Sequence, residues 1–279
     1  MAFSAEISRT NPTCLLFLVD QSTSMDGPFG GQPGKKKSEG VADAINRLLQ
    51  NLVLKCAKST GVRDYFHVGV IGYGSEVRPI LVGTGPTRPL LPISAVANAP
   101  LRVEQRTRKV DDGAGGLIER PLRFPVWFEP VANGKTPMNA AVELATRVVN
   151  TFLDAHPNCF PPLVVNLTDG QPTDANPLAA AQALKGLKST DGSVLLLNAH
   201  LSSAPAPPIA FPHTEDVLPD VFAKLLFRMS SLLPTPMAQA AQEEGYAIAG
   251  PSRGFMFNAD LVAVTRFLEI GTRVASSVR

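Results

Sequence analysis

Short apolar runs alternate along the chain with longer segments in which apolar residues recur every three or four positions. The clearest runs cover residues 15–19, 65–74, 163–167 and 194–199. Runs of this length are too short to cross a membrane and are typical of strands buried on both faces. Strands of that kind belong to parallel sheets that are covered by helices.

The periodic segments predict helices between these strands. They cover residues 41–56, 138–152, 177–187, 217–233, 237–244 and 260–274. We expect Ser38 to cap the first helix, and Thr136 to cap the second with Pro137 at its first position. Residues 77–82 and 255–257 predict two further strands. The alternation predicts an α/β fold with a doubly wound, mostly parallel, Rossmann-like central sheet and helices on both faces.

The rhythm changes between residues 84 and 134, where prolines are frequent and no helical period is visible. Two strand-like runs, 101–110 and 117–128, flank a glycine- and aspartate-rich turn at 111–116, which predicts a β-hairpin. A two-stranded unit cannot hold a core by itself. We therefore interpret residues 84–134 as an insertion within a single domain of residues 1–279.

Two groups of charged residues need an explanation. Arginines and a glutamate alternate along one side of the first hairpin strand (Arg102, Glu104, Arg106 and Arg108). We consider three explanations: this side of the strand is solvated, it meets an acidic surface, or its arginines form an acid-seeking rim, that is, a rim that attracts acidic groups, beside the loop that precedes Thr136. Lysines at 35–37 stand just before a helix, where cations oppose the helix dipole. They are either simply solvated or attract an acidic partner.

Composition narrows the class of protein. The formal charge of +2 over 279 residues gives no reason to expect a nucleic acid or a membrane as partner. Cys14, Cys56 and Cys159 are odd in number and far apart, which argues against a disulfide framework and favours a reducing compartment. We expect Cys14 and Cys56 to be small core residues. Residues 1–12 show no signal-peptide pattern, and no run approaches ~18 apolar residues. We expect a soluble, cytoplasmic protein.

Oxygen-bearing side chains follow the first apolar run. Asp20, Ser22 and Ser24 stand on one short loop, at the end of the strand where open α/β sheets place their ligands. Such side chains suit a hard cation such as Mg²⁺. The alternative is that they form only a turn and a helix cap.

Two later loops share this property. Asp169 directly follows the apolar run at 163–167, and Thr136 stands before a buried helix. In a parallel sheet the first and third of these loops lie at the same carboxyl edge, and a helix that begins there brings Thr136 in. We therefore predict one site that combines Asp20, Ser22, Ser24, Thr136 and Asp169.

These three loops resemble those of the von Willebrand factor A (VWA) domains that carry a metal-ion-dependent adhesion site (MIDAS), in particular bacterial-type intracellular members. The family pattern is D-x-S-x-S, a threonine before a central helix, and T-D-G; here these are residues 20–24, 134–138 and 167–170. The resemblance covers residues 13–274 without the hairpin. Thr23 replaces a common glycine, so we expect a stiffer loop with intact coordination. A long segment at 27–34 could cover or extend the rim.

The resemblance implies a metal-dependent protein-binding module for adhesion or scaffolding. The hydroxyls of Ser22, Ser24 and Thr136 would bind Mg²⁺ (or Mn²⁺ or Ca²⁺) directly, and Asp20 and Asp169 would act at least partly through water. A partner protein's aspartate or glutamate would then complete the octahedron. Family members of this type often accompany an AAA ATPase or belong to signalling systems, which makes such a partner plausible here.

Two other functions remain open. A magnesium-dependent phosphoryl-transfer enzyme could use the same cation, but the sequence has no D-x-D after the first strand, no Walker motif and no G-x-S-x-G. His67, His156, His200 and His213 stand in no paired context, and we expect His67 to be a packed strand residue. A structural subunit, in which the metal only clamps loops, is the third possibility. We expect a binding module and not an enzyme.

Overall fold

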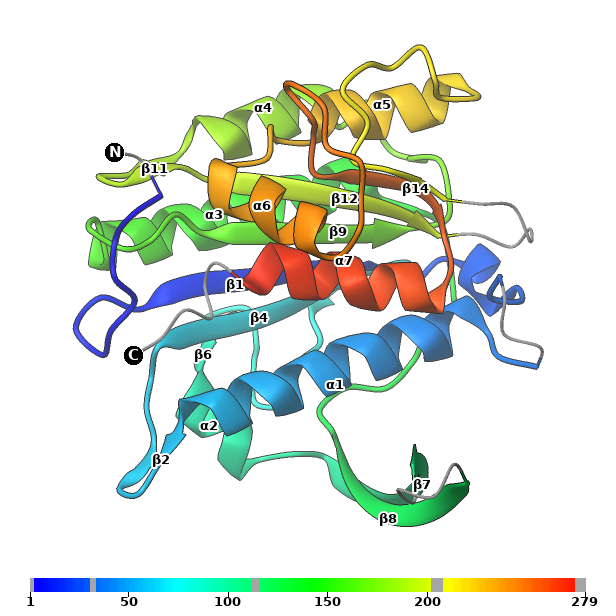
Figure 1. Ribbon diagram of the computed structural model, residues 1–279. Coiled ribbons are helices and arrows are strands. Elements are labelled where there is room, and N and C mark those ends of the chain that lie inside the picture. The colour runs from blue at the N-terminus through cyan, green and yellow to red at the C-terminus, as the bar shows by residue number, and fades with distance from the viewer. Residues whose placement is uncertain (1–2, 31–33, 112–115, 202–207, 274–279) are drawn as a thin grey trace.

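The computed structural model describes residues 3–30, 34–111, 116–201 and 208–273. Its centre is an eight-stranded sheet in the order β13-β14-β12-β9-β1-β4-β5, with β6 paired to β4 (Figure 1). The five inner strands are parallel: β1 (Thr13–Asp20), β4 (Phe66–Tyr73), β9 (Leu163–Thr168), β12 (Leu195–Leu201) and β14 (Phe255–Ala259). The edge strands are antiparallel: β5 (Val77–Pro79), β6 (Leu91–Pro92) and β13 (Ile209–Ala210).

Helices cover both faces of this sheet. One face carries α1 (Lys37–Cys56), α2 (Ile93–Asn98), α6 (Thr235–Glu243) and α7 (Leu261–Arg273). The other carries α3 (Met138–Ala155), α4 (Leu178–Gly186) and α5 (Val221–Met229). Strand β1 serves both layers, because Leu15 and Phe17 pack under α1 and α7 while Cys14 and Leu16 pack under α3. The predicted mostly parallel α/β sheet with two helical layers is confirmed.

The connections place a topological switch point between β1 and β9. From β1 the chain crosses one face through α1 to β4, and it returns through α3 on the other face to β9. The two strands run parallel in register, with Val19 beside Leu167. In open α/β sheets a crevice forms where neighbouring connections leave to opposite faces, at the carboxyl ends of the strands. Asp20 ends β1 and Asp169 follows β9, so both residues flank this crevice.

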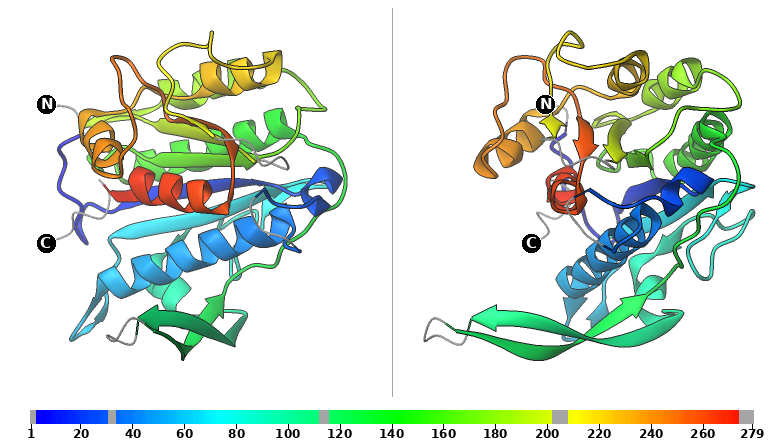
Figure 2. Two further views of the ribbon diagram at one scale, coloured as in Figure 1. Left: turned by 45° about the vertical axis from the view of Figure 1, so that its right-hand side comes forward. Right: turned by 90° about the vertical axis from the view of Figure 1, so that its right-hand side faces the viewer.

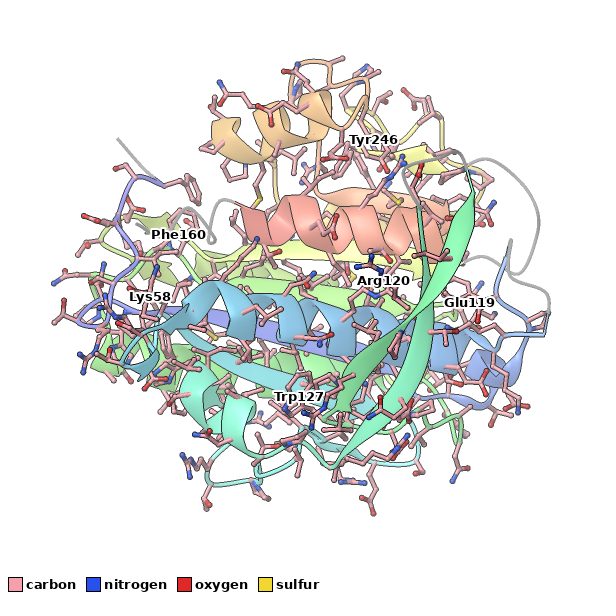
Figure 3. The ribbon with its side chains drawn as sticks, turned by 60° about the horizontal axis from the view of Figure 1, so that its bottom comes forward. Lys58, Glu119, Arg120, Trp127, Phe160 and Tyr246 are labelled. Carbon is pink, nitrogen blue, oxygen red and sulfur yellow. The ribbon has the colours of Figure 1, made fainter. Side chains whose placement is uncertain are left out.

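The predicted hairpin is present as β7 (Arg102–Asp111) and β8 (Leu117–Val126). Its turn residues 112–115 lie outside the described part. Figure 2 shows a long twisted ribbon beside α1. Trp127 lies at its base, where it is 2% exposed and its indole donates to the Val96 carbonyl at 2.6 Å, whereas Glu119 and Arg120 lie farther along β8 (Figure 3).

The charged side of the ribbon meets an acidic partner inside the chain. Arg106 pairs with Asp43 of α1 at 2.9 Å and with Glu104 at 2.7 Å, and Arg102 pairs with Glu104 and Glu129. An acid-seeking rim formed by these two arginines is therefore not favoured, because their charges are already matched. The side chain of Arg108 lies outside the described part.

Several predicted boundaries are wrong for local reasons. No helix was expected in residues 84–134, but α2 is there; its six residues are too few to show a period. Helix α5 is shorter than the predicted 217–233 because Asp220 caps it by accepting from the Ala223 N–H at 2.7 Å. Short two-stranded turns add β2 (Ala57–Lys58) with β3 (Gly61–Val62), and β10 (Lys188–Ser189) with β11 (Gly192–Ser193).

Helix α1 begins one residue before the predicted cap. Lys37 is its first residue, Lys36 occupies the N-cap position and Ser38 lies inside the helix, so the assignment of Ser38 as N-cap is wrong. Glu39 accepts from the Lys36 N–H at 3.1 Å, which satisfies part of the helix end instead. The three cysteines are buried and unbridged, which confirms the core positions expected for Cys14 and Cys56. Among the described helices, none combines the length and apolar character needed to pass through a bilayer.

Candidate metal site

Asp20 is fixed at the end of β1 by two hydrogen bonds. Its Oδ1 accepts from the Ser22 N–H at 2.8 Å, and its Oδ2 accepts from the Thr168 hydroxyl at 2.6 Å. The side chain is fully buried. Burial raises the pKa of Asp20 to about 6, against the hydrogen bonds from Ser22 and Thr168, which lower it, and the charge of Asp169 raises it further. This carboxylate is oriented but short of positive charge.

The two serines connect the first loop to the third. The chain turns into a short 3₁₀ helix, η1 (Thr23–Asp26), with Ser22 at its N-cap position. The Oγ atoms of Ser22 and Ser24 are 3.0 Å apart, and Ser24 donates to Asp169 Oδ1 at 2.7 Å. Residues 145 positions apart in the sequence are therefore in direct contact.

Thr136 reaches the site, but not as a helix cap. Helix α3 begins at Met138 with Pro137 at the N-cap position, so both predicted positions are shifted by one residue. Asp174 takes over the cap: its carboxylate accepts from the N–H groups of Asn139 at 3.2 Å and Ala140 at 2.9 Å. Capping from another loop frees the Thr136 side chain to face the site.

Gly170 shows how closely the oxygens converge. A Cβ at this position would lie 3.3 Å from Thr136 Oγ1, 3.6 Å from Ser24 Oγ and 3.9 Å from Asp20 Oδ2. Two oxygens of the first loop and one of the second thus lie around Gly170, which belongs to the third loop. All five predicted residues are brought to this place, counting Ser22 and Asp169 through their contacts with Ser24.

A second glycine locks two of the loops together. Gly134 has φ +92°, a conformation that other residues rarely adopt, and its carbonyl accepts from the Thr23 N–H at 3.1 Å. A side chain there would collide with the backbone of Ser75. The Thr23 hydroxyl also donates to the Gly134 carbonyl at 3.2 Å, so both the backbone and the side chain of Thr23 contact the neighbouring loop.

Two residues of the site were not predicted. Thr168 donates to Asp20 Oδ2, also accepts from the Gly170 N–H at 3.2 Å, and has no exposed surface. Lys37 forms an ion pair with Asp169 Oδ2, and the two side chains are only 7% and 1% exposed. The lysine run at 35–37 is visible in the sequence, but we expected it to be either solvated or to attract an acidic partner from outside the chain. Instead, all three lysines pair inside the chain, with Asp43, Asp26 and Asp169.

The donor set decides which cation suits the site. Within the described ranges no group of three or more His, Cys, Asp and Glu side chains is arranged to hold a metal ion. The site has two carboxylates and three hydroxyls, all oxygen donors, and so suits a hard cation that retains water ligands. A thiolate- or imidazole-binding cation would find no such ligands among these five residues.

The segment after η1 is partly tied to α1. Phe29 is 2% exposed and packs against Gly40, and its N–H donates to the Lys35 carbonyl at 2.8 Å. Residues 31–33 of this loop lie outside the described part, so the expected cover over the rim stays a prediction.

Comparisons with known proteins reveal similarity of structure only. No family's sequence model matches this chain, and no curated protein matches it. Among solved structures, it is similar to the PilB minor pilin from Streptococcus sanguinis, with 12% identity over 96% of this chain and 62% of that one, and a TM-score of 0.47. It is also similar to the ArnB paralog VWA2 from Sulfolobus acidocaldarius, with 11% identity over 96% and 46% of the chains and a TM-score of 0.41. A third is proximal thread matrix protein 1 from the mussel byssus, with 14% identity over 98% and 48% and a TM-score of 0.41. The chain spans less than two thirds of the length of each of these proteins.

Proposed function

We propose that this chain is a metal-dependent protein-binding module of the VWA type. Ser22, Ser24 and Thr136 would bind Mg²⁺ through their hydroxyl oxygens, and Asp20 and Asp169 would hold it at least partly through water. An aspartate or glutamate carboxylate from a partner protein would then occupy the coordination position that faces solvent. The module would serve adhesion or scaffolding.

The observation that carries this proposal is the convergence around Gly170. The first and second loops place hydroxyl and carboxylate oxygens around Gly170 of the third loop, and Asp169 of that third loop accepts from Ser24, at the switch point of the sheet. A turn with a helix cap would not need Thr136 or Asp169, and the cap of α3 is made by Asp174 instead. The alternative that Asp20 and the serines form only a turn and a helix cap therefore accounts for one of the three loops and not for the other two.

Two of the histidines, His67 and His156, lie away from the candidate site. His67 is the second residue of β4 and lies beside Cys14, at the opposite edge of the sheet from Asp20. Its ring contacts those of Phe152 and His156, with centroids 5.5 and 5.4 Å away. These two imidazoles are thus too far along the strands to serve as a base for Ser22 or Ser24.

Metal and partner binding can be tested together. The full chain, immobilised, would be exposed to lysate with Mg²⁺ or with excess chelator, and captured proteins would be identified by mass spectrometry. Purified candidates would then be titrated against wild type and Ser22→Ala, and we expect loss of binding with the chelator and with the variant. A partner that binds equally well in chelator would overturn the proposal.

The control must alter a hydroxyl outside the site. Thr151→Ala removes an exposed hydroxyl whose hydrogen bond goes to the Arg147 carbonyl within α3. It should bind metal and partner as wild type does. Melting curves of all variants with and without Mg²⁺ separate loss of the site from loss of the fold.

A further inference from the structure

We propose that Lys37 acts as a tethered cation within the metal site and makes metal binding depend on the partner's carboxylate. This inference rests on the proposed function, because it concerns the same site. Lys37 lies outside the five predicted ligands, and its charge would couple the binding of the metal to the binding of the carboxylate.

Lys37 is held in place by its backbone and its surroundings. It is the first residue of α1, and its N–H donates to the Gly27 carbonyl at 3.0 Å, just after η1. A Cβ at Gly27 would lie 3.4 Å from Lys37 Cε and 3.6 Å from Nζ, so the chain at Gly27 lies directly against this side chain. The ammonium group then reaches Asp169 Oδ2, whose other oxygen accepts from Ser24.

The neighbouring lysines show that this placement is particular to Lys37. Lys36 pairs with Asp26 at 2.6 Å, with side chains 49% and 56% exposed, and Lys35 pairs with Asp43 at 2.5 Å in half-buried surroundings. An exposed pair such as Lys36 with Asp26 contributes little. Asp169 is only 1% exposed, so its charge has little help from water, and an opposite charge next to it has a strong effect.

The charges of the site explain the consequence. Two carboxylates, Asp20 and Asp169, and one ammonium leave a single net negative charge. A divalent cation makes this site net positive, and an incoming carboxylate restores neutrality. Without Lys37 the metal alone would neutralise the two carboxylates, and an incoming carboxylate would be attracted less strongly.

Two properties follow for the wild-type chain. The bare metal binds weakly, because it must approach or displace the ammonium group of Lys37. Carboxylate and metal also strengthen each other's binding, and by thermodynamic reciprocity the factor is the same in both directions. Lys37 would therefore determine how strongly the metal-bound site prefers a carboxylate as its additional ligand.

Mn²⁺ and acetate are suitable probes for this coupling. We would measure the affinity of the full chain for Mn²⁺ by electron paramagnetic resonance at pH 8, with and without acetate, for wild type, Lys37→Gln and Lys36→Gln. Lys36→Gln removes the same charge from the adjacent residue, where the side chain is exposed. Calorimetric melting with and without Mn²⁺ would show whether each variant is folded.

We expect Lys37→Gln to bind Mn²⁺ at least about tenfold more tightly than wild type in the absence of acetate. Acetate should strengthen Mn²⁺ binding to wild type and to Lys36→Gln, but much less to Lys37→Gln. If the variant unfolds without metal because Asp169 is left unpaired, Lys37→Gln with Asp169→Asn restores charge balance and should fold, yet bind Mn²⁺ weakly.

The outcomes separate this inference from the proposed function. Equal Mn²⁺ affinity in wild type, Lys37→Gln and Lys36→Gln would overturn the role of Lys37 and leave the metal site standing. An equal gain in both single variants would also overturn it, since general charge would then be the cause. Absence of Mn²⁺ binding in every folded variant would instead overturn the proposed function itself.

Discussion

Thr168 donates a 2.6 Å hydrogen bond to Asp20 across two neighbouring parallel strands, at the point where both strands end. Neither side chain is exposed. The same hydroxyl oxygen accepts from the Gly170 N–H at 3.2 Å, so one atom links the strand end of β1 to the loop after β9. Thr168 thus fixes the orientation of the Asp20 carboxylate without being one of the five predicted ligands.

Replacing Thr168 with valine keeps the shape and removes this hydroxyl. A hydrogen bond to a charged group contributes about 1.5–3 kcal/mol, so we expect Thr168→Val to bind Mn²⁺ roughly tenfold more weakly or worse. The melting temperature without metal should fall as well, because Asp20 Oδ2 is buried and loses its Thr168 donor, while the Ser22 N–H bonds only Oδ1. Thr151→Val, on the outer face of α3, is the matched control. Unchanged metal affinity in Thr168→Val would show that Asp20 needs no such support.

The pattern of apolar residues predicted the layers of this fold, because strands buried on both faces are continuously apolar and the helices that cover them are apolar on one side only. Strands β1 and β9 are apolar throughout their centres, and α3 shows a regular apolar stripe. Helix ends were harder, because their caps come from other loops. Asp174 caps α3 from 34 and 35 positions away, and no local pattern around Thr136 contains that information.

The residues of the candidate site also differ in whether local sequence could predict them. Asp20, Ser22 and Asp169 follow apolar strands, so their position at the sheet edge could be inferred from strand ends alone. Lys37 could not, because its partner lies 132 residues away and a lysine before a helix is ordinarily exposed. The ion pair exists because α1 starts directly beside the loop after β9, which is a fact of the tertiary structure.

A chain of buried polar groups crosses the sheet beneath the site, and we predict that it stabilises the fold. The Tyr73 hydroxyl donates to Asn166 at 2.6 Å, Asn166 donates to Asn198 at 3.0 Å, and Asn198 donates to Ser230 at 2.9 Å. Tyr73→Phe leaves the Asn166 oxygen without this donor in a buried place, which should cost about 1–3 kcal/mol of unfolding free energy in urea.

The comparison variant for this prediction is Tyr65→Phe. The Tyr65 hydroxyl accepts from Arg63 at 3.3 Å at a partly buried position, so its loss should cost less than about 1 kcal/mol. Equal losses in the two variants would mean that the chain of amides has no special weight. Tyr73→Phe combined with Asn166→Leu should be less destabilising than the sum of the two single changes, because both disrupt one hydrogen bond.

His200 should make the protein less stable in mild acid. Burial lowers its pKa from 6.5 to about 4, against the attraction of Asp169 and Asp220, and its Nδ1 accepts from the Asn258 N–H at 3.3 Å. The unfolded chain binds a proton at this residue as the pH falls below 6.5, but the folded chain resists it down to about 4. The stabilising contribution is therefore complete above pH 6.5 and is lost as the pH falls to 4.

Unfolding in urea at pH 7.5 and pH 5 measures this effect. We expect His200→Gln to lose less stability than wild type between the two pH values, by on the order of 1–2 kcal/mol. His213→Gln, which alters an exposed histidine, should behave as wild type does. The same pH dependence in His200→Gln and wild type would assign the acid sensitivity to other groups.

The hairpin should be held to α1 mainly by Arg106. Its guanidinium lies 3.7 Å from the centre of the Phe124 ring while it pairs with Asp43 and Glu104, so it joins both strands of the ribbon to the helix. Because this arginine is about one third exposed, we expect Arg106→Gln to lower the unfolding free energy by only about 0.5–1 kcal/mol.

The rate of local opening of the hairpin should change far more than the global stability. Trp127 and the base of the hairpin remain buried in Arg106→Gln, while the outer ribbon loses its contact with Asp43. Hydrogen exchange of the amides in β7 and β8 should accelerate severalfold in Arg106→Gln but not in Arg120→Gln, which alters an exposed arginine on the same ribbon. Unchanged exchange in both variants would show that the hydrogen bonds between the Asn46 and Gln50 side chains of α1 and the backbone of β8 and of the residues after it are sufficient to hold the ribbon.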